Sequence, residues 1–241
     1  MSGSRGRSLL QRAEKLGRVE GASDREAAVD DEEGHRVDPQ LLRGQLKPAS
    51  GRGALVLLSG AFLTPALQAA YPQLLRELTT LGYSIALDTN WPPQGWNAAL
   101  RAEVAEWISY CDHVLLNDLE VCSLADSPEL ATAIEQVKSM LRSGAALIVK
   151  TGARGAIGID SRQRCESPAP ATTIFDTIGA GDSFNAGYLL ARLDGATLAD
   201  SVAAGCRAAS AIISRFPRHA IGAGELAGLR VRAAPPAARQ A

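Results

Sequence analysis

Apolar positions fall into two alternating patterns along this chain. Short, nearly unbroken apolar runs predict buried strands at 54–58, 83–87, 113–116, 145–149 and 156–159. Longer segments with apolar residues at helical spacing predict helices within 65–81, 100–108, 130–141 and 198–213. Because buried strands alternate with helices, we expect a mostly parallel sheet covered on both faces, which is a three-layer α/β fold.

The two ends of the chain lack this pattern. Residues 1–36 are rich in Arg, Glu, Asp, Gly and Ser, so we expect a disordered or loosely attached segment. Asp38 and Pro39 suit the cap and first residue of a helix that opens a single domain over 37–226. The tail over 227–241 is expected to be frayed.

Polar residues come directly after several of the predicted strands: Ser59, Asp88, Asn90, Asn117 and Thr151. The carboxyl ends of parallel strands share one edge of a sheet, and open α/β sheets bind ligands outside that edge. The sequence therefore predicts a ligand site there.

The stretch Asp176–Asn185 is the strongest chemical signal. Its small residues Gly179, Ala180 and Gly181 precede an apolar run that can form a helix. A helix start carries unpaired N–H groups, and glycine lets a phosphate approach them closely. A carboxylate there, Asp182, could take a proton from an attacking hydroxyl. The alternative is that Asp182 caps the helix and the glycines only make a turn.

The string from Asp176 to Asp182 resembles Asp-Thr-x-Gly-Ala-Gly-Asp, the signature of the ribokinase-like (PfkB) family of sugar and nucleoside kinases. The resemblance implies a ribokinase-like fold, ATP as the phosphoryl donor and Asp182 as the base that contacts the substrate hydroxyl. The N–H groups from Gly179 to Asp182 would hold the developing charge. It also implies a monovalent cation such as K⁺ near Asp176.

A second element, Asn117 and Glu120, matches the Asn-x-x-Glu pattern of the same family. The amide can hydrogen-bond a phosphate, and the carboxylate can hold Mg²⁺ directly or through water. The alternative is a capping box, in which Asn117 is the N-cap of a helix and Glu120 closes the box.

The loop from Lys150 to Gly155 resembles the family's strand-end loop along the nucleotide, so Lys150, Gly152 and Gly155 become candidate nucleotide contacts. The alternative is an ordinary hairpin turn. The resemblance also places the adenine near Cys206, where an Asn is common in the family.

Asp88 and Asn90 belong to a segment that resembles the family's Asp-x-Asn-x-Arg, and they become candidate substrate contacts. Pro92 stands where the family has the arginine, which removes a cation. The alternative is a polar strand end followed by a Pro-rich turn.

The resemblance runs from about 38 to 225 and fails before that. The family's leading strands, its Gly-Gly-x-x-Asn substrate loop and its β-lid have no counterpart in this sequence. Two hypotheses remain: an ATP-dependent kinase that phosphorylates a hydroxyl of a small sugar-like substrate, and a truncated, non-catalytic nucleotide-binding or structural relic. Neither a Rossmann G-x-G-x-x-G after the first strand nor a P-loop motif is present.

Composition excludes some partners. The net charge of −1 gives no general attraction to nucleic acid or membrane, and no apolar run approaches a bilayer-spanning length. The four cysteines lack metal or C-x-x-C spacing and suit a reducing compartment, so we expect a cytoplasmic protein with a small-molecule substrate. A homodimer is left open, because family dimers often form through the lid.

Overall fold

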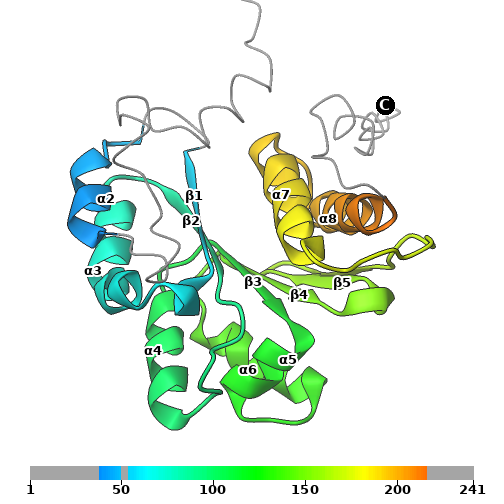
Figure 1. The fold of residues 1–241 in the computed structure, drawn as a ribbon, viewed down its shortest axis with the longest axis horizontal. Helices are drawn as coiled ribbons and strands as arrows, with labels where there is room; N and C mark the ends of the chain where they lie inside the picture. The colour runs from blue at the N-terminus through cyan, green and yellow to red at the C-terminus, as the bar shows by residue number, and fades with distance from the viewer. Residues whose placement is uncertain (1–37, 50–53, 216–241) are drawn as a thin grey trace, which may run out of the picture.

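The computed structural model describes residues 38–49 and 54–215. Its centre is a six-stranded sheet in the order β1–β2–β3–β4–β5–β6 (Figure 1). The strands are β1 (Leu55–Ser59), β2 (Ser84–Asp88), β3 (His113–Asn117), β4 (Ala146–Lys150), β5 (Ala156–Ile159) and β6 (Arg164–Ser167). Strands β1 to β4 run parallel, whereas β5 and β6 are antiparallel to their neighbours.

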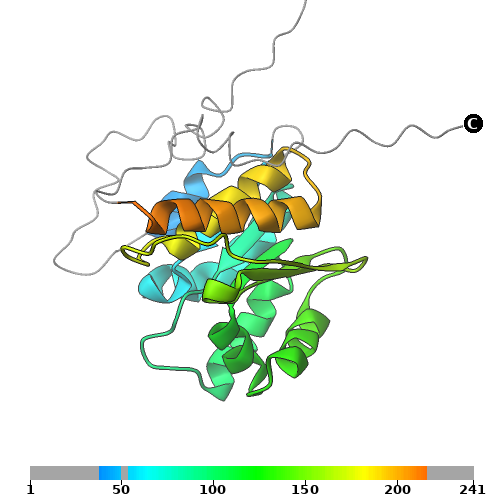
Figure 2. The same ribbon diagram turned by 90° about the vertical axis from the view of Figure 1, so that its right-hand side faces the viewer.

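Helices form the two outer layers. They are α2 (Pro39–Gln45), α3 (Pro65–Thr80), α4 (Ala98–Ile108), α5 (Asp118–Ala125), α6 (Leu130–Met140), α7 (Ala180–Leu193) and α8 (Leu198–Ile213), with short 3-10 turns η1 (Ala61–Leu63) and η2 (Gly152–Arg154). Figures 1 and 2 show α7 and α8 together on one face of the sheet and α4 to α6 on the other.

Strand alternation divides the interior into two cores. Leu87, Leu116 and Val149 point toward the core shared with α3 to α6. Their neighbours Ala86 and Leu115 point to the opposite core, under α7 and α8. The unbroken apolar strands are therefore explained by burial on both faces.

Two glycines set the spacing of α7 and α8. A Cβ on Gly187 would lie 2.7 Å from Ala208 Cβ, and a Cβ on Gly205 would lie 2.8 Å from the Phe184 ring. Side-chain-free positions on both helices thus allow a close approach.

The predicted three-layer α/β fold is confirmed, and so are the five strands and the predicted helices. The pattern missed α5, which is only eight residues long, and β6, whose side chains are not buried. Asp38 caps α2 as predicted, by accepting a hydrogen bond from the Gln40 N–H at 2.8 Å. The predictions for 1–36 and 227–241 lie outside the described residues. Among the described helices, none combines the length and hydropathy that a membrane span requires.

Candidate active site

Four polar residues end the parallel strands β1 to β4 at the same edge of the sheet: Ser59, Asp88, Asn117 and Lys150. The strand registers pair Ser59 with Asp88 and Asn117 with Lys150. Side chains alternate between the two faces of a strand. Each of the four residues lies two or four positions after a residue of its own strand that packs in the α7–α8 core, so all four side chains lie on the α7–α8 side of the sheet. The predicted polar edge therefore exists.

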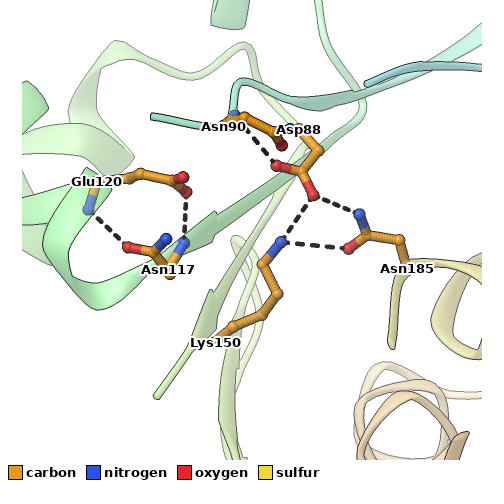
Figure 3. A network of polar contacts seen from close by, with 6 residues as sticks. All are labelled: Asp88, Asn90, Asn117, Glu120, Lys150 and Asn185. Atoms are coloured by element: carbon orange, nitrogen blue, oxygen red, sulfur yellow. Dashed lines mark hydrogen bonds and ion pairs between the residues drawn. The ribbon is translucent and has the colours of Figure 1, made fainter. Parts of the chain in front are cut away.

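Asp88 and Lys150 meet beside helix α7 (Figure 3). The Lys150 ammonium lies 2.8 Å from Asp88 Oδ2, and the same carboxylate oxygen accepts a hydrogen bond from the Asn185 amide. Lys150 also approaches Asn185 Oδ1 at 3.5 Å, and the Asn90 N–H approaches Asp88 Oδ1 at 3.4 Å. Asp88 is 3% exposed and Asn185 0%, so this is a buried, internally paired network.

Asn117 and Glu120 form a complete capping box at the start of α5. Asn117 Oδ1 accepts the Glu120 N–H at 2.8 Å, and Glu120 Oε2 accepts the Asn117 N–H at 2.8 Å (Figure 3). The capping interpretation is thus confirmed, and the box fixes where the Glu120 carboxylate lies. Burial raises the pKa of Glu120, against the opposing effects of the Asn117 N–H and the Lys150 charge.

The described residues contain no group of three or more His, Cys, Asp or Glu side chains placed to hold a metal ion. Mg²⁺ commonly takes one or two protein carboxylates and completes its shell with water and substrate phosphates. The chemistry of a single buried carboxylate at the sheet edge fits that mode of binding.

Helix α7 begins with a turn that only glycine adopts easily. Gly179 is the N-cap with φ of 75°, and no side chain caps the helix. The Ala180 N–H donates to the Thr177 carbonyl at 3.1 Å. The following two N–H groups, of Gly181 and Asp182, have no intrahelical acceptor because they lie in the first turn. Asp182 is exposed in this turn and is not the cap.

The candidate nucleotide contacts Gly152, Gly155 and Cys206 differ in how much open space surrounds them. A Cβ on Gly152 would meet no atom within 4 Å, so its surroundings are open. A Cβ on Gly155 would lie 2.0 Å from the Ser167 carbonyl, so this glycine is needed for packing against β6. The loop does connect the antiparallel strands β4 and β5, as the hairpin interpretation requires. Cys206 is 4% exposed, and its thiol lies 3.5 Å from the Ser167 carbonyl.

The structure brings together Asp88, Lys150 and Asn117–Glu120, which are distant in sequence. Asp176 is exposed before α7, where its Oδ1 accepts the Ile178 N–H at 2.9 Å. Asn185 was not predicted from the sequence as a site residue. The available signal was an amide within an apolar run of the sequence, and the structure shows that Asn185 is fully buried in α7.

Curated relatives of this chain are sugar kinases by name. It is 30% identical over 169 residues to 2-dehydro-3-deoxygluconokinase of Dickeya dadantii (strain 3937), covering 66% of this chain and 53% of the relative. It is 31% identical over 109 residues to fructoselysine 6-kinase of Escherichia coli (strain K12), covering 45% of this chain and 42% of the relative. The chain thus spans about half the length of the curated relatives that it matches.

A solved kinase structure has a similar fold. Aminoimidazole riboside kinase from Salmonella enterica, complexed with aminoimidazole riboside and an ATP analogue, matches with a TM-score of 0.62 and 21% identity, covering 75% of this chain and 61% of that chain. The sequence model of the pfkB family carbohydrate kinases matches residues 14–217, so the similarity begins before residue 38, where the motifs had placed its start. The chain therefore belongs to the pfkB family of carbohydrate kinases, with a ribokinase-like α/β fold.

Proposed function

We propose that the chain carries the nucleotide-binding and catalytic part of an ATP-dependent kinase that phosphorylates a hydroxyl of a small sugar or sugar-like molecule. One observation carries the proposal: Asp182 is exposed in the first turn of α7, directly after a glycine N-cap whose geometry leaves backbone N–H groups at the sheet edge. A carboxylate and an anion site thus stand side by side, as phosphoryl transfer to an alcohol requires.

Asp182 accepts the proton of the substrate hydroxyl in this reaction. The hydroxyl oxygen forms a bond to the γ-phosphorus while the bond from that phosphorus to the β–γ bridging oxygen breaks, and ADP leaves. The N–H groups of Gly181 and Asp182 donate to the phosphoryl oxygens as charge develops on them. Mg²⁺, when bound, would offset phosphate charge, and Glu120 is the residue that would hold it, directly or through water.

The nucleotide side of the site consists of Asn117, Lys150 and Gly152. Gly152 has open surroundings that let a ligand pass close to the backbone. Asn117 has its side-chain oxygen committed to the capping box, which leaves its amide nitrogen as the donor for a phosphate. K⁺ near Asp176 and a homodimer stay predictions.

For the acceptor, the names of the relatives indicate sugar acids and sugar derivatives as the substrate class. Asn90 is the better of the two candidate substrate contacts. It is partly exposed at the sheet edge in a left-handed conformation (φ 60°), whereas both oxygens of Asp88 already accept hydrogen bonds within the protein.

A second candidate is a nucleotide-binding protein that transfers no phosphoryl group to a sugar. The internal pairing of Asp88 favours it, because that pairing removes one of the acceptor contacts expected of a working kinase.

Two measurements on the purified chain separate the candidates. Calorimetric titration with ATP and ADP, with and without Mg²⁺, should show binding that Mg²⁺ strengthens. Coupled assays of ADP release over a panel of sugars, sugar acids and nucleosides should then show acceptor-dependent turnover. Nucleotide binding without any acceptor-dependent turnover supports the second candidate, and the absence of nucleotide binding contradicts both.

A further inference from the structure

The network of Asp88, Lys150 and Asn185 joins three elements that are not neighbours in sequence. Asp88 ends β2 and Lys150 ends β4, with β3 between these strands. The Lys150 side chain therefore crosses the end of β3 to reach Asp88, as Figure 3 shows. Asn185 meets both from α7, so the network ties the helix to two separated strand ends.

The Asp88 carboxylate has more of its hydrogen-bonding capacity used within the protein than the Lys150 ammonium has. Asp88 accepts from Lys150, from the Asn185 amide and from the Asn90 N–H. Lys150 has three N–H donors, and the contacts to Asp88 and Asn185 use two of them. The ammonium lies 3.8 Å from the point where a Cβ on Gly181 would stand, which places its charge beside the first turn of α7.

We propose that Asp88 and Asn185 are positioning residues, which hold the Lys150 ammonium beside the first turn of α7 so that it donates to the terminal phosphate of a bound nucleotide. This inference rests on the proposed nucleotide-binding function. It gives Asp88 an indirect role in place of a substrate contact, and it gives Asn185 a role that the sequence did not indicate.

Side-chain entropy and exposure favour Lys150 as the phosphate contact, with Asp88 and Asn185 holding it in place. A lysine side chain loses considerable rotamer entropy when it is held in place, and a flexible ammonium would sample many positions at the sheet edge. Its side chain is 15% exposed, against 5% for that of Asp88, so the ammonium is the more accessible partner of the pair. Gly181 leaves the intervening space open, because any side chain there would approach the ammonium.

The test is a double-mutant cycle on nucleotide affinity, measured by calorimetry with ATP and Mg²⁺ on the full chain. Lys150→Met keeps an unbranched side chain that is one atom shorter and removes the charge, and we expect roughly 10-fold weaker binding or more. Asn185→Ala should weaken binding several-fold in the wild-type background. In the Lys150→Met background it should have no further effect, because the residue acts through Lys150.

Tyr188→Phe is the matched control. Tyr188 is buried on the same helix and loses only a hydroxyl that bonds His113, so melting temperature can fall without a change in nucleotide affinity. If Lys150→Met does not fold, the double variant Asp88→Asn/Lys150→Met removes both charges together and leaves no unpaired buried carboxylate. It should fold and show the same weakened binding.

Each outcome decides a separate question. Equal losses from Asn185→Ala in both backgrounds, or wild-type affinity in Lys150→Met, would overturn the inference while the proposed function stands. No nucleotide binding by the wild-type chain would overturn the proposed function and the inference with it.

Discussion

Two carboxylates at the same sheet edge have opposite surroundings. Asp88 is 3% exposed and is paired with an ammonium and an amide. Asp182 is exposed, at the start of α7. Proton transfer from a substrate hydroxyl requires direct access to the carboxylate. The geometry therefore separates the two roles, with Asp182 as the group that can touch a substrate and Asp88 as a group that acts inside the protein.

Replacing Asp182 tests the proposed base. Asp182→Asn should lower acceptor-dependent turnover by about 10²–10⁴-fold, because the amide cannot accept the proton. ATP affinity should stay similar or rise slightly, because a negative charge near the γ-phosphate is removed. Steady-state kinetics and calorimetry on the same preparation measure the two effects. Turnover close to that of the wild type would remove Asp182 from the mechanism.

The contact between His113 and Tyr188 under α7 should make the stability of the fold sensitive to acid. Its Nδ1 lies 3.0 Å from the Tyr188 hydroxyl, and burial, aided by the charge of Arg192 and opposed by that of Asp112, lowers the pKa of His113 to about 4. A depressed folded-state pKa gives stability that is present above the unfolded value of 6.5 and is lost as pH falls toward 4. The loss is at most roughly 3 kcal/mol.

Thermal unfolding at several pH values checks this. Between pH 7 and pH 4 the wild type should lose more stability than His113→Gln, which has no proton to gain in that range. Parallel curves for the two proteins would show that His113 does not titrate differently in the folded state.

The sequence indicated candidate site residues only where a short local motif contains them. Asp182 and the Asn117–Glu120 pair lie within short motifs, so their spacing and the resemblance to the family's motifs made them candidates. The Asp88–Lys150 and Asp88–Asn185 contacts join residues that are 62 and 97 positions apart. No local pattern specifies such pairs, because they depend on how β2, β4 and α7 come together.

At the scale of elements, α5 couples a cap to a candidate metal ligand. Glu120→Gln retains a side-chain oxygen that can accept the Asn117 N–H, so the capping box survives and melting temperature should change little. The lost charge should raise the Mg²⁺ concentration needed for half-maximal nucleotide binding. Calorimetry across a Mg²⁺ series, with unfolding curves beside it, measures both.

The control is Glu120→Ala, which breaks the box and should cost about 1 kcal/mol of stability. If Glu120→Gln loses that much stability while its Mg²⁺ dependence is unchanged, then Glu120 only caps α5.

The α7–α8 pair makes a packing prediction. A Cβ on Gly187 would lie 2.7 Å from Ala208 Cβ and 2.9 Å from the Ala204 carbonyl. Gly187→Ala should therefore push the helices apart and cost roughly 1–3 kcal/mol, despite the better helix propensity of alanine. Denaturant unfolding measures the loss, and Ala186→Ser, exposed on the same helix, should change stability by less than about 0.5 kcal/mol. Unchanged stability of Gly187→Ala would mean that the helices can separate freely.

The apolar periodicity predicted where most strands and helices lie, but it did not predict whether neighbouring strands run parallel or antiparallel. Apolar runs predicted β4 and β5 equally well, yet β5 is antiparallel because the short η2 turn leaves no room for a crossover helix. The strand β6 has polar residues at three of four positions, Arg164, Glu166 and Ser167, so hydrophobicity gave no signal for it. Pairing with β5, rather than burial, makes it a strand.

For the whole molecule, the layers cover the sheet unevenly. Helices α7 and α8 lie over the β3–β5 side in Figure 1, and β1 is paired only with β2 among the described residues. Leu57 in β1 is 39% exposed on the face shared with Leu55, although leucines of central strands such as Leu115 are fully buried. The net charge of −1 provides little repulsion between copies.

Among the described residues β1 is an edge strand, and an exposed leucine on such a strand favours self-association. We therefore expect the purified chain to associate as its concentration rises, with little dependence on salt because the contact is apolar. Leu57→Lys should lower this association, since an edge lysine opposes pairing with a second strand. Sedimentation velocity over a concentration series measures it, and Leu119→Lys, at a leucine that is 65% exposed on α5, is the matched control. Equal association of Leu57→Lys and wild type, or an equal loss in the control, would show that the β1 edge is not the contact.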